Sequence, residues 1–158
     1  PGSKSDQLIC LTDLFATLSE IVGAKLPKGS AEDSVSFLPA LSGQKITSTR
    51  NGVIHHSISG HFAYRQGPWK LLLARASGGW TSPKENQAKK DSAPAQLYDM
   101  KADVGERKNL YFEEPEVAKK LLALLKEDVQ RGRSTKGIPS NNDVDKIVIW
   151  KNGSPKAK

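Results

Sequence analysis

Apolar and β-branched residues alternate with polar ones most densely between residues 53 and 74. This pattern predicts three β-strands, over 53–57, 61–65 and 69–74. Residues 66–68 read Gln-Gly-Pro and predict a tight turn, so the second and third strands should form an antiparallel hairpin. A fourth strand is expected over 96–100, with alternate side chains on opposite faces.

Helical periodicity flanks this strand region on both sides. Residues 8–22 carry apolar side chains at three- and four-residue spacing, and we expect this helix to cover the sheet. A short helical turn is expected within 33–43, and a long helix should begin at Glu114 or Pro115 and end at Gly132. The predicted fold is α+β: a four-stranded antiparallel sheet, a long C-terminal helix packed on it, and an N-terminal helix. The apolar faces comprise Leu11, Leu14, Phe15, Leu18, Ile21 and Val22 in the first helix, and Val117, Leu121, Leu124, Leu125 and Val129 in the last.

Two segments lack any periodic pattern. Residues 75–95 are rich in Gly, Ser, Lys, Asn and Pro and predict a long loop, with Trp80 near its centre. A large aromatic residue in a polar loop either folds back onto the core or forms part of a binding surface. Residues 134–158 are expected to be a polar linker and tail, in which 146–150 form either an edge strand or a surface-bound segment.

Composition narrows the class of protein. With 158 residues, 37% hydrophobic and 26% charged, the chain is about one domain with an ordinary core. Its net charge of +7 would attract a polyanion, but the lysines are spread and no nucleic-acid-binding signature accompanies them. We therefore favour a solvated basic surface over nucleic-acid binding. No apolar run approaches the roughly 18 residues that cross a bilayer, so no membrane association is expected.

All three histidines lie within seven residues. His55 and His56 should point to opposite faces of their strand, and His61 begins the next strand. A closed metal site is not expected, because zinc usually takes three or four ligands and the chain has no further histidine. Either one histidine is buried and two are solvated, or one histidine joins Arg65 and Lys70 in a pocket that binds an anion.

The sequence offers no complete catalytic apparatus. Ser57 and Ser59 lie near histidines, but no Gly-x-Ser-x-Gly motif surrounds them. Cys10, the only cysteine, has apolar neighbours and should simply pack. The carboxylates near residue 100 are better suited to capping backbone groups than to acid–base catalysis. We therefore predict no catalytic residue in this chain.

Four segments, taken together and in this order, resemble sulfatases. Residues 12–23 resemble the family's Asp-Leu-Phe-Pro-Thr-Leu segment, and 33–43 its Asp-Gly-x-Ser-Leu-Leu-Pro-Leu-Leu-x-Gly segment. Residues 63–71 resemble the Ala-Val-Arg-x-Gly-x-Trp-Lys-Leu hairpin, and 96–110 resemble Leu-Tyr-Asp-Leu-x-x-Asp-Pro-x-Glu-x-x-Asn-Leu. The resemblance covers about residues 1–133, which it identifies as a sulfatase C-terminal subdomain.

The resemblance implies a division of labour within a larger enzyme. The formylglycine nucleophile and the calcium ligands of sulfatases belong to a catalytic domain that is not expected here, and Cys10 lacks the motif for modification to formylglycine. The chain is therefore expected to close the substrate cleft, to stabilise the catalytic domain as its partner, and to be inactive alone, with no cofactor of its own. A periplasmic or secreted location is also implied.

On this basis five residues are candidates for contact with a sulfated sugar or an aryl sulfate ester: His55, His56, His61, Arg65 and Trp80. Positive and aromatic groups suit such a substrate, although the same residues could instead attach the subdomain to the catalytic domain. Two different functions are retained as alternatives. One is a free-standing module that binds anionic glycans, and the other, less favoured, is a basic nucleic-acid binder.

Overall fold

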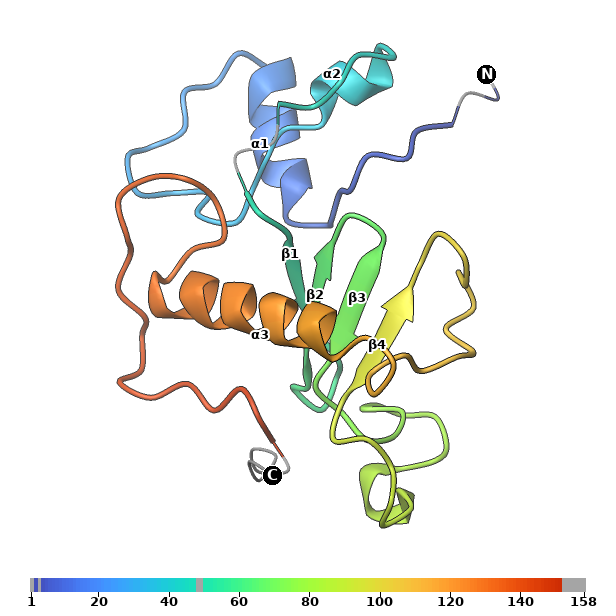
Figure 1. Ribbon diagram of the computed structural model, residues 1–158. Helices are drawn as coiled ribbons and strands as arrows, with labels where there is room; N and C mark the ends of the chain where they lie inside the picture. Colours follow the sequence, from blue (N-terminus) through green and yellow to red (C-terminus); the bar gives the residue numbers. More distant parts are fainter. Residues whose placement is uncertain (1, 3, 48–49, 152–158) are drawn as a thin grey trace. The chain divides into compact units, whose positions relative to one another are not determined.

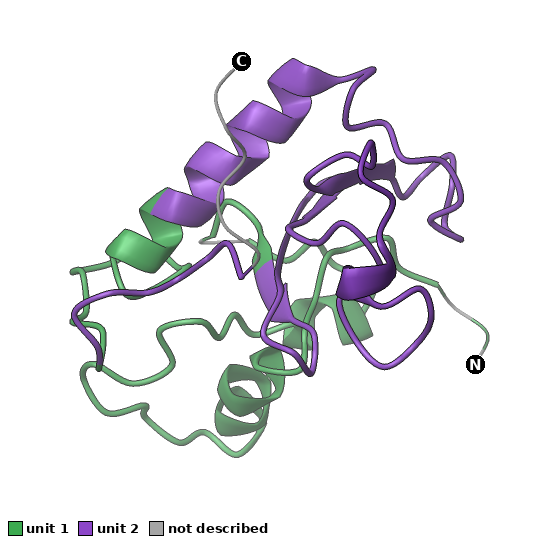
Figure 2. Cartoon of the chain, turned by 90° about the horizontal axis from the view of Figure 1, so that it is seen from below, with its two compact units in different colours: residues 1–53, 127–143 green, residues 54–126, 144–158 purple. Residues whose placement is uncertain are grey.

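The computed structural model describes residues 2, 4–47 and 50–151 (Figure 1). Its contacts divide the chain into two compact units, shown in Figure 2. Unit 1 comprises residues 1–53 and 127–143, and unit 2 comprises residues 54–126 and 144–158. No helix within the described ranges is both long enough and apolar enough to cross a membrane.

The sheet of unit 2 has the strand order β1-β2-β3-β4. Its strands are β1 (Val53–His56), β2 (Phe62–Gln66), β3 (Trp69–Leu72) and β4 (Gln96–Asp99). The antiparallel pairing of β2 with β3 and of β3 with β4 confirms the predicted hairpin and fourth strand, each within two residues of its expected ends. Gly67 makes the hairpin turn with φ +54°, a left-handed conformation that glycine adopts without strain.

The core of unit 2 contains a row of apolar side chains that crosses the sheet. Tyr64 is paired with Leu71, which is paired in turn with Leu97, and these three residues are at most 1% exposed. Helix α3 (Pro115–Gln130) runs across the strands in Figure 1. Its buried Leu121 and Leu125 confirm the predicted apolar stripe and, by removing apolar surface from water, stabilise this unit.

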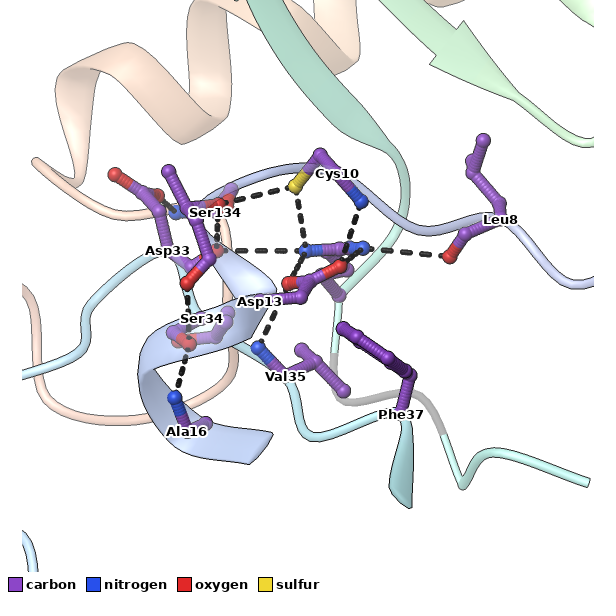
Figure 3. A network of polar contacts seen from close by, with 12 residues as sticks. Leu8, Cys10, Asp13, Ala16, Asp33, Ser34, Val35, Phe37 and Ser134 are labelled. Atoms are coloured by element: carbon purple, nitrogen blue, oxygen red, sulfur yellow. Dashed lines mark hydrogen bonds and ion pairs between the residues drawn. The ribbon is translucent and has the colours of Figure 1, made fainter. Parts of the chain in front are cut away.

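Unit 1 contains helix α1 (Asp13–Ile21) and the short helix α2 (Leu38–Leu41). Helix α1 begins five residues later than the predicted 8–22, because the Asp13 carboxylate fixes the chain before it. Asp13 Oδ2 accepts the N–H of Cys10 at 2.8 Å, and Oδ1 accepts the N–H of Val35 at 2.9 Å (Figure 3). The carboxylate thus joins the start of the helix to a segment twenty-two residues away.

A buried ion pair lies at the centre of unit 1. The Arg50 guanidinium binds both oxygens of Asp13, with Nη1 2.6 Å from Oδ1 and Nη2 2.7 Å from Oδ2. The two side chains are 4% and 1% exposed. Burial alone would raise the pKa of Asp13, but the bonds from Arg50, Val35 and Cys10 outweigh it and hold that pKa below its usual range. Asp13 is therefore ionised at neutral pH and satisfied by four donors.

The apolar face of α1 is exposed, which corrects the expectation that this face would be buried against the sheet. Phe15 is 51% exposed, Leu18 56% and Val22 73%, whereas the buried residues of the helix are Asp13 and Thr17. The helix is placed by polar bonds instead, because Thr17 Oγ1 accepts the N–H of Phe37 at 3.0 Å. The exposed apolar residues of this helix and its flanks, here called the α1 face, are Leu11, Leu14, Phe15, Leu18, Ile21 and Val22.

The C-terminal residues that the structure describes form no regular strand. No strand forms at residues 146–150, so the alternative of an edge strand is wrong, and Trp150 at the end of this segment is only 9% exposed. Arg50 and Thr135 form an isolated β-bridge within unit 1. The predicted boundary at residue 133 stays a prediction, and 152–158 of the predicted tail lie outside the described residues.

Candidate functional site

A row of polar side chains crosses the face of the sheet opposite the apolar core row. Arg65 is paired with Lys70, and Lys70 with Tyr98, one position along from the apolar pairs. Because successive side chains of a strand point to opposite faces, this one-residue step places the polar side chains on the other face. The register of β2, β3 and β4 therefore builds a continuous polar row.

His55 extends this row onto β1. The ring of its neighbour His56 contacts Phe62 edge-on, with centroids 4.1 Å apart and planes at 84°, so His56 lies on the face opposite Arg65. His55 consequently lies on the Arg65 face, as the predicted alternation of the two histidines requires. The positive groups of Lys70 and Arg65 are close enough to influence its charge. We call His55, Arg65, Lys70 and Tyr98 the polar row.

One acidic residue balances this basic group. Lys70 Nζ lies 2.6 Å from Glu106 Oε1, in a pair whose side chains are 19% and 31% exposed. The Tyr98 hydroxyl donates to Gln96 Oε1 at 2.6 Å, and burial followed by the charges of Glu106 and Asp103 raises the pKa of Tyr98. With Lys70 paired, the cations of the row that remain for an external anion are Arg65 and, when protonated, His55.

The histidine of the row is neutral at pH 7. Burial by surrounding protein atoms lowers the pKa of His55, although the residue as a whole is exposed. Lys70 and Arg65 lower this pKa further, and Glu106 opposes them. The Nε of Arg65 is buried and has no hydrogen-bond partner among the described residues. A neutral imidazole beside a guanidinium can donate an N–H to an anion, and acidification adds a positive charge at the same place.

The other predicted contact residues lie elsewhere in unit 2. His56 is on the opposite face, where burial and then the charge of Lys151 lower its pKa. His61 is only 4% exposed, and its Nδ1 lies 3.1 Å from the Leu73 carbonyl oxygen, which makes it the one buried histidine. Trp80 is 79% exposed on the connection between β3 and β4. The structure thus brings together His55 and Arg65, and the predicted role of all five residues stays a prediction.

Two members of this neighbourhood were not among the sequence candidates. Tyr98 joins the polar row because its strand pairs with β3 in this register, and Glu106 joins it through a salt bridge to Lys70, 36 residues away in the chain. Local periodicity indicates neither of these contacts. The available signal was the pairing of the predicted fourth strand with the hairpin. Lys70 had been named as a partner of Arg65, and the pairing of their Cα positions places them side by side.

The described residues do not gather metal ligands. No group of three or more His, Cys, Asp or Glu residues among them could hold an ion. Several acidic side chains bind backbone N–H groups or cations instead; Asp103 Oδ2, for example, accepts the N–H groups of Arg107 and Lys108. No set of residues in the described part of the chain fits the calcium ion that the resemblance implies for the full-length enzyme.

Comparison with curated proteins identifies relatives along much of the chain. The N-acetylgalactosamine-6-O-sulfatase of Bacteroides thetaiotaomicron is 32% identical over 126 residues, which are 78% of this chain and 24% of that protein. An ulvan-active sulfatase of Formosa agariphila is 48% identical over 46 residues, or 29% of this chain and 9% of that protein. None of the protein-family models that were scanned matches the chain.

Solved structures agree with these relatives. One, from a study of glycosaminoglycan metabolism by Bacteroides thetaiotaomicron, has a TM-score of 0.58 and 28% identity, and the match covers 75% of this chain and 24% of that one. A 2-O GAG sulfatase has a TM-score of 0.53 and 26% identity, with the same coverage of 75% and 24%. The chain thus spans about a quarter of the length of these proteins. It is a homologue of sulfatases over that quarter.

Proposed function

We propose that the chain is the C-terminal subdomain of a sulfatase, which closes the substrate cleft, stabilises the catalytic domain and is inactive by itself. The observation that carries this proposal is the α1 face. Contiguous exposed apolar residues mark surfaces that meet another protein, and this face lies in a segment that resembles sulfatases. A catalytic domain of the sulfatase type is the occupant we assign to it, since about three quarters of the relatives' length has no counterpart in this chain.

In this proposal the polar row supplies substrate contacts. Arg65 and His55 bind a sulfate or carboxylate group, while Glu106 holds Lys70 beside them. The relatives are named for sulfated N-acetylgalactosamine and for ulvan, so the substrate class we assign is a sulfated polysaccharide. His56, His61 and Trp80 stay separate predicted contacts outside the polar row, since His56 lies on the opposite face of the sheet, His61 is buried and Trp80 is exposed on the connection between β3 and β4.

A complementation experiment tests the proposal. The N-acetylgalactosamine-6-O-sulfatase relative would be truncated to remove the quarter that matches this chain, and the chain would be fused in its place. We expect hydrolysis of a chromogenic aryl sulfate by the fusion and none by the chain alone. Turnover by the chain alone would contradict the proposal, and so would a folded fusion whose activity stays at that of the truncated enzyme.

A substitution on the α1 face makes this test specific. Leu18→Ser should lower the free energy of unfolding of the isolated chain by no more than about 1 kcal/mol, because the side chain is already exposed and serine costs only a few tenths of that in helix propensity. In the fusion the same change should lower activity and heat stability. Ile138→Ser, at another exposed apolar position of unit 1, is the matched control and should change neither. Equal effects of the two variants would remove the α1 face as the docking surface.

A second function is favoured by one separate observation, the net charge of +7. A free-standing module that binds anionic glycans would bind sulfated polymers without any catalytic domain. Tight and salt-resistant binding by the isolated chain, together with failure of the fusion, would favour this module. Loss of binding in proportion to added salt would indicate charge attraction alone.

A further inference from the structure

The connection between β3 and β4 was predicted to be a long loop without a periodic pattern, and in the structure side-chain hydrogen bonds order it. Its organiser is the carboxylate of Glu85. Glu85 Oε2 accepts the N–H of Arg75 at 3.0 Å, and Oε1 accepts the N–H groups of Ala76 at 2.8 Å and Gly78 at 3.1 Å. Hydrogen bonds to an ionised acceptor are about twice as strong as neutral ones, so one side chain fixes the backbone where it leaves the sheet. We call residues 75–92 the tryptophan loop.

A second set of bonds closes the tip of this loop. The N–H of Ser77 donates to the Pro83 carbonyl at 3.0 Å, and the Ser77 hydroxyl donates to the Thr81 carbonyl at 2.7 Å. Lys84 Nζ donates to the carbonyl of Gly79 at 3.2 Å and also to that of Trp80. The backbone that carries Trp80 is therefore held from both sides before any ligand binds.

The base of the loop is seated on the sheet. A Cβ added at Gly78, whose φ is +66°, would lie 3.2 Å from Ala74 Cβ and 3.5 Å from His61 Cβ. Only glycine fits this close approach without strain. The buried His61 thus lies against the loop at Gly78, whereas Trp80, two residues further along, is 79% exposed. A large ring held in water on a preordered backbone binds a ligand with little further loss of conformational entropy.

We propose that Trp80 is a stacking surface for one sugar ring of an anionic polysaccharide, and that Glu85 is the residue that positions it. The loop carries four basic and two acidic residues, which suits a negatively charged polymer. A pyranose ring presents C–H groups on one face, and these pack on the electron-rich face of an indole. The inference rests on the proposed function only for the identity of the polymer as a sulfated one. Trp80 therefore determines preference for a polymer over a small sulfate ester.

The stacking is tested by titrating the 158-residue chain with oligosaccharides of chondroitin 6-sulfate. In this polymer, glucuronic acid alternates with 6-sulfated N-acetylgalactosamine. The measured quantity is the Kd, read from the shifts of the tryptophan indole N–H signals and from calorimetry. Trp80→Ala should weaken binding about tenfold, and Trp80→Phe should keep most of the affinity because a ring remains. Phe112→Ala removes another exposed aromatic ring of unit 2 and should leave the Kd unchanged. Circular dichroism checks that each variant is folded.

A double-mutant cycle tests the role of Glu85. Glu85→Gln should weaken binding severalfold, although it removes a negative charge and would by charge alone strengthen it. Asp91→Asn, on the same loop, measures that charge effect. If Glu85 acts through Trp80, then Glu85→Gln combined with Trp80→Ala binds no more weakly than Trp80→Ala alone. Additive losses would mean that Glu85 has only a general structural role and would overturn its assignment.

Three results would overturn the stacking assignment. They are unchanged binding by Trp80→Ala, an equal loss in Phe112→Ala, and absence of any binding by the parent chain. None of these three results bears on the complementation test, because that test uses an aryl sulfate, which has no sugar ring for Trp80 to contact. If Trp80→Ala instead abolished aryl sulfatase activity of the fusion, the indole would be a contact with the catalytic domain, and the saccharide assignment would also fall.

Discussion

The two units of the chain are built on opposite principles. Unit 2 places an apolar row, Tyr64, Leu71 and Leu97, in its interior and its polar row on the other face of the sheet. Unit 1 places the ion pair of Asp13 and Arg50 in its interior and leaves apolar helix residues in water. Unit 2 therefore has the hydrophobic core expected of an independent module, whereas unit 1 has the surface expected of a part of something larger.

The difference explains why α1 is well placed despite burying no apolar stripe. Its start is held by charge-assisted hydrogen bonds, and it does not depend on the removal of apolar surface from water. This leaves the whole α1 face for a partner. A buried ion pair is weak evidence of stability in itself, but the loss of one member is costly because the other charge is then buried alone.

The largest effect is expected at this ion pair. Asp13→Asn leaves the Arg50 guanidinium buried without its counter-charge, and the free energy of unfolding should fall by about 3–5 kcal/mol. Hydrogen exchange resolved by mass spectrometry should show faster exchange of the amide groups near Cys10 and Val35, which the carboxylate now binds.

The control is an ion pair of the same charges in water. Lys108 and Glu113 are 2.7 Å apart with side chains 67% and 55% exposed. Glu113→Gln should change stability by no more than about 1 kcal/mol, since exposed pairs are screened. Equal losses in the two variants would show that the burial of the Asp13 pair does not govern the stability of unit 1.

A somewhat smaller effect is expected in the apolar row of unit 2. Leu97→Ala removes a fully buried side chain and should lower the free energy of unfolding by about 2–5 kcal/mol, measured by urea denaturation. The same substitution at Leu18, on the α1 face, should cost less than about 1 kcal/mol, because this side chain is already 56% exposed and alanine favours the helix at least as much as leucine does. Similar costs at the two positions would mean that the α1 face is already covered within the isolated chain.

The sequence predicted unit 2 better than unit 1, and the reason is physical. A hairpin is defined locally by two segments of alternating apolar and polar residues with a Gly-Pro turn between them, and β4 has an alternating pattern of its own. The bounds predicted for β2, β3 and β4 are therefore within two residues of those observed. Helical periodicity shows that a helix has an apolar face but carries no information about what covers it. The partner of Asp13 lies 37 residues away, and no local pattern connects the two.

The candidate site divides in the same way. The hairpin was sufficient to place Arg65 beside Lys70, because the turn fixes the register. The salt bridge of Glu106 to Lys70 depends on how the segment after β4 folds back, which periodicity does not describe. The tryptophan loop was expected to be irregular from its composition. Its order comes from the Glu85 carboxylate, which binds three backbone N–H groups, and from the bonds of Ser77 and Lys84 that close its tip.

The smallest and most selective effect is expected in the titration of the histidines. The pKa values of His55 and His56 are both lowered, mainly by burial, but the charges near them differ: Lys70 and Arg65 for His55, and Lys151 for His56. Lys70→Met should therefore raise the pKa of His55 and leave that of His56 unchanged. The two imidazole signals, followed by NMR across the pH range, measure both values in one experiment.

The sign of the pH effect follows from these directions. Each folded-state pKa lies below the value of about 6.5 for an unfolded histidine, so the unfolded chain binds more protons in that window. The stability contribution is complete above about pH 6.5 and is lost as the pH falls through the folded-state pKa. Anion binding by the polar row should change in the opposite direction, because protonation adds a positive charge beside Arg65. Sulfate affinity that rises on acidification in the parent, and rises less in His55→Gln, would place the anion at this row; an identical rise in both would place it elsewhere.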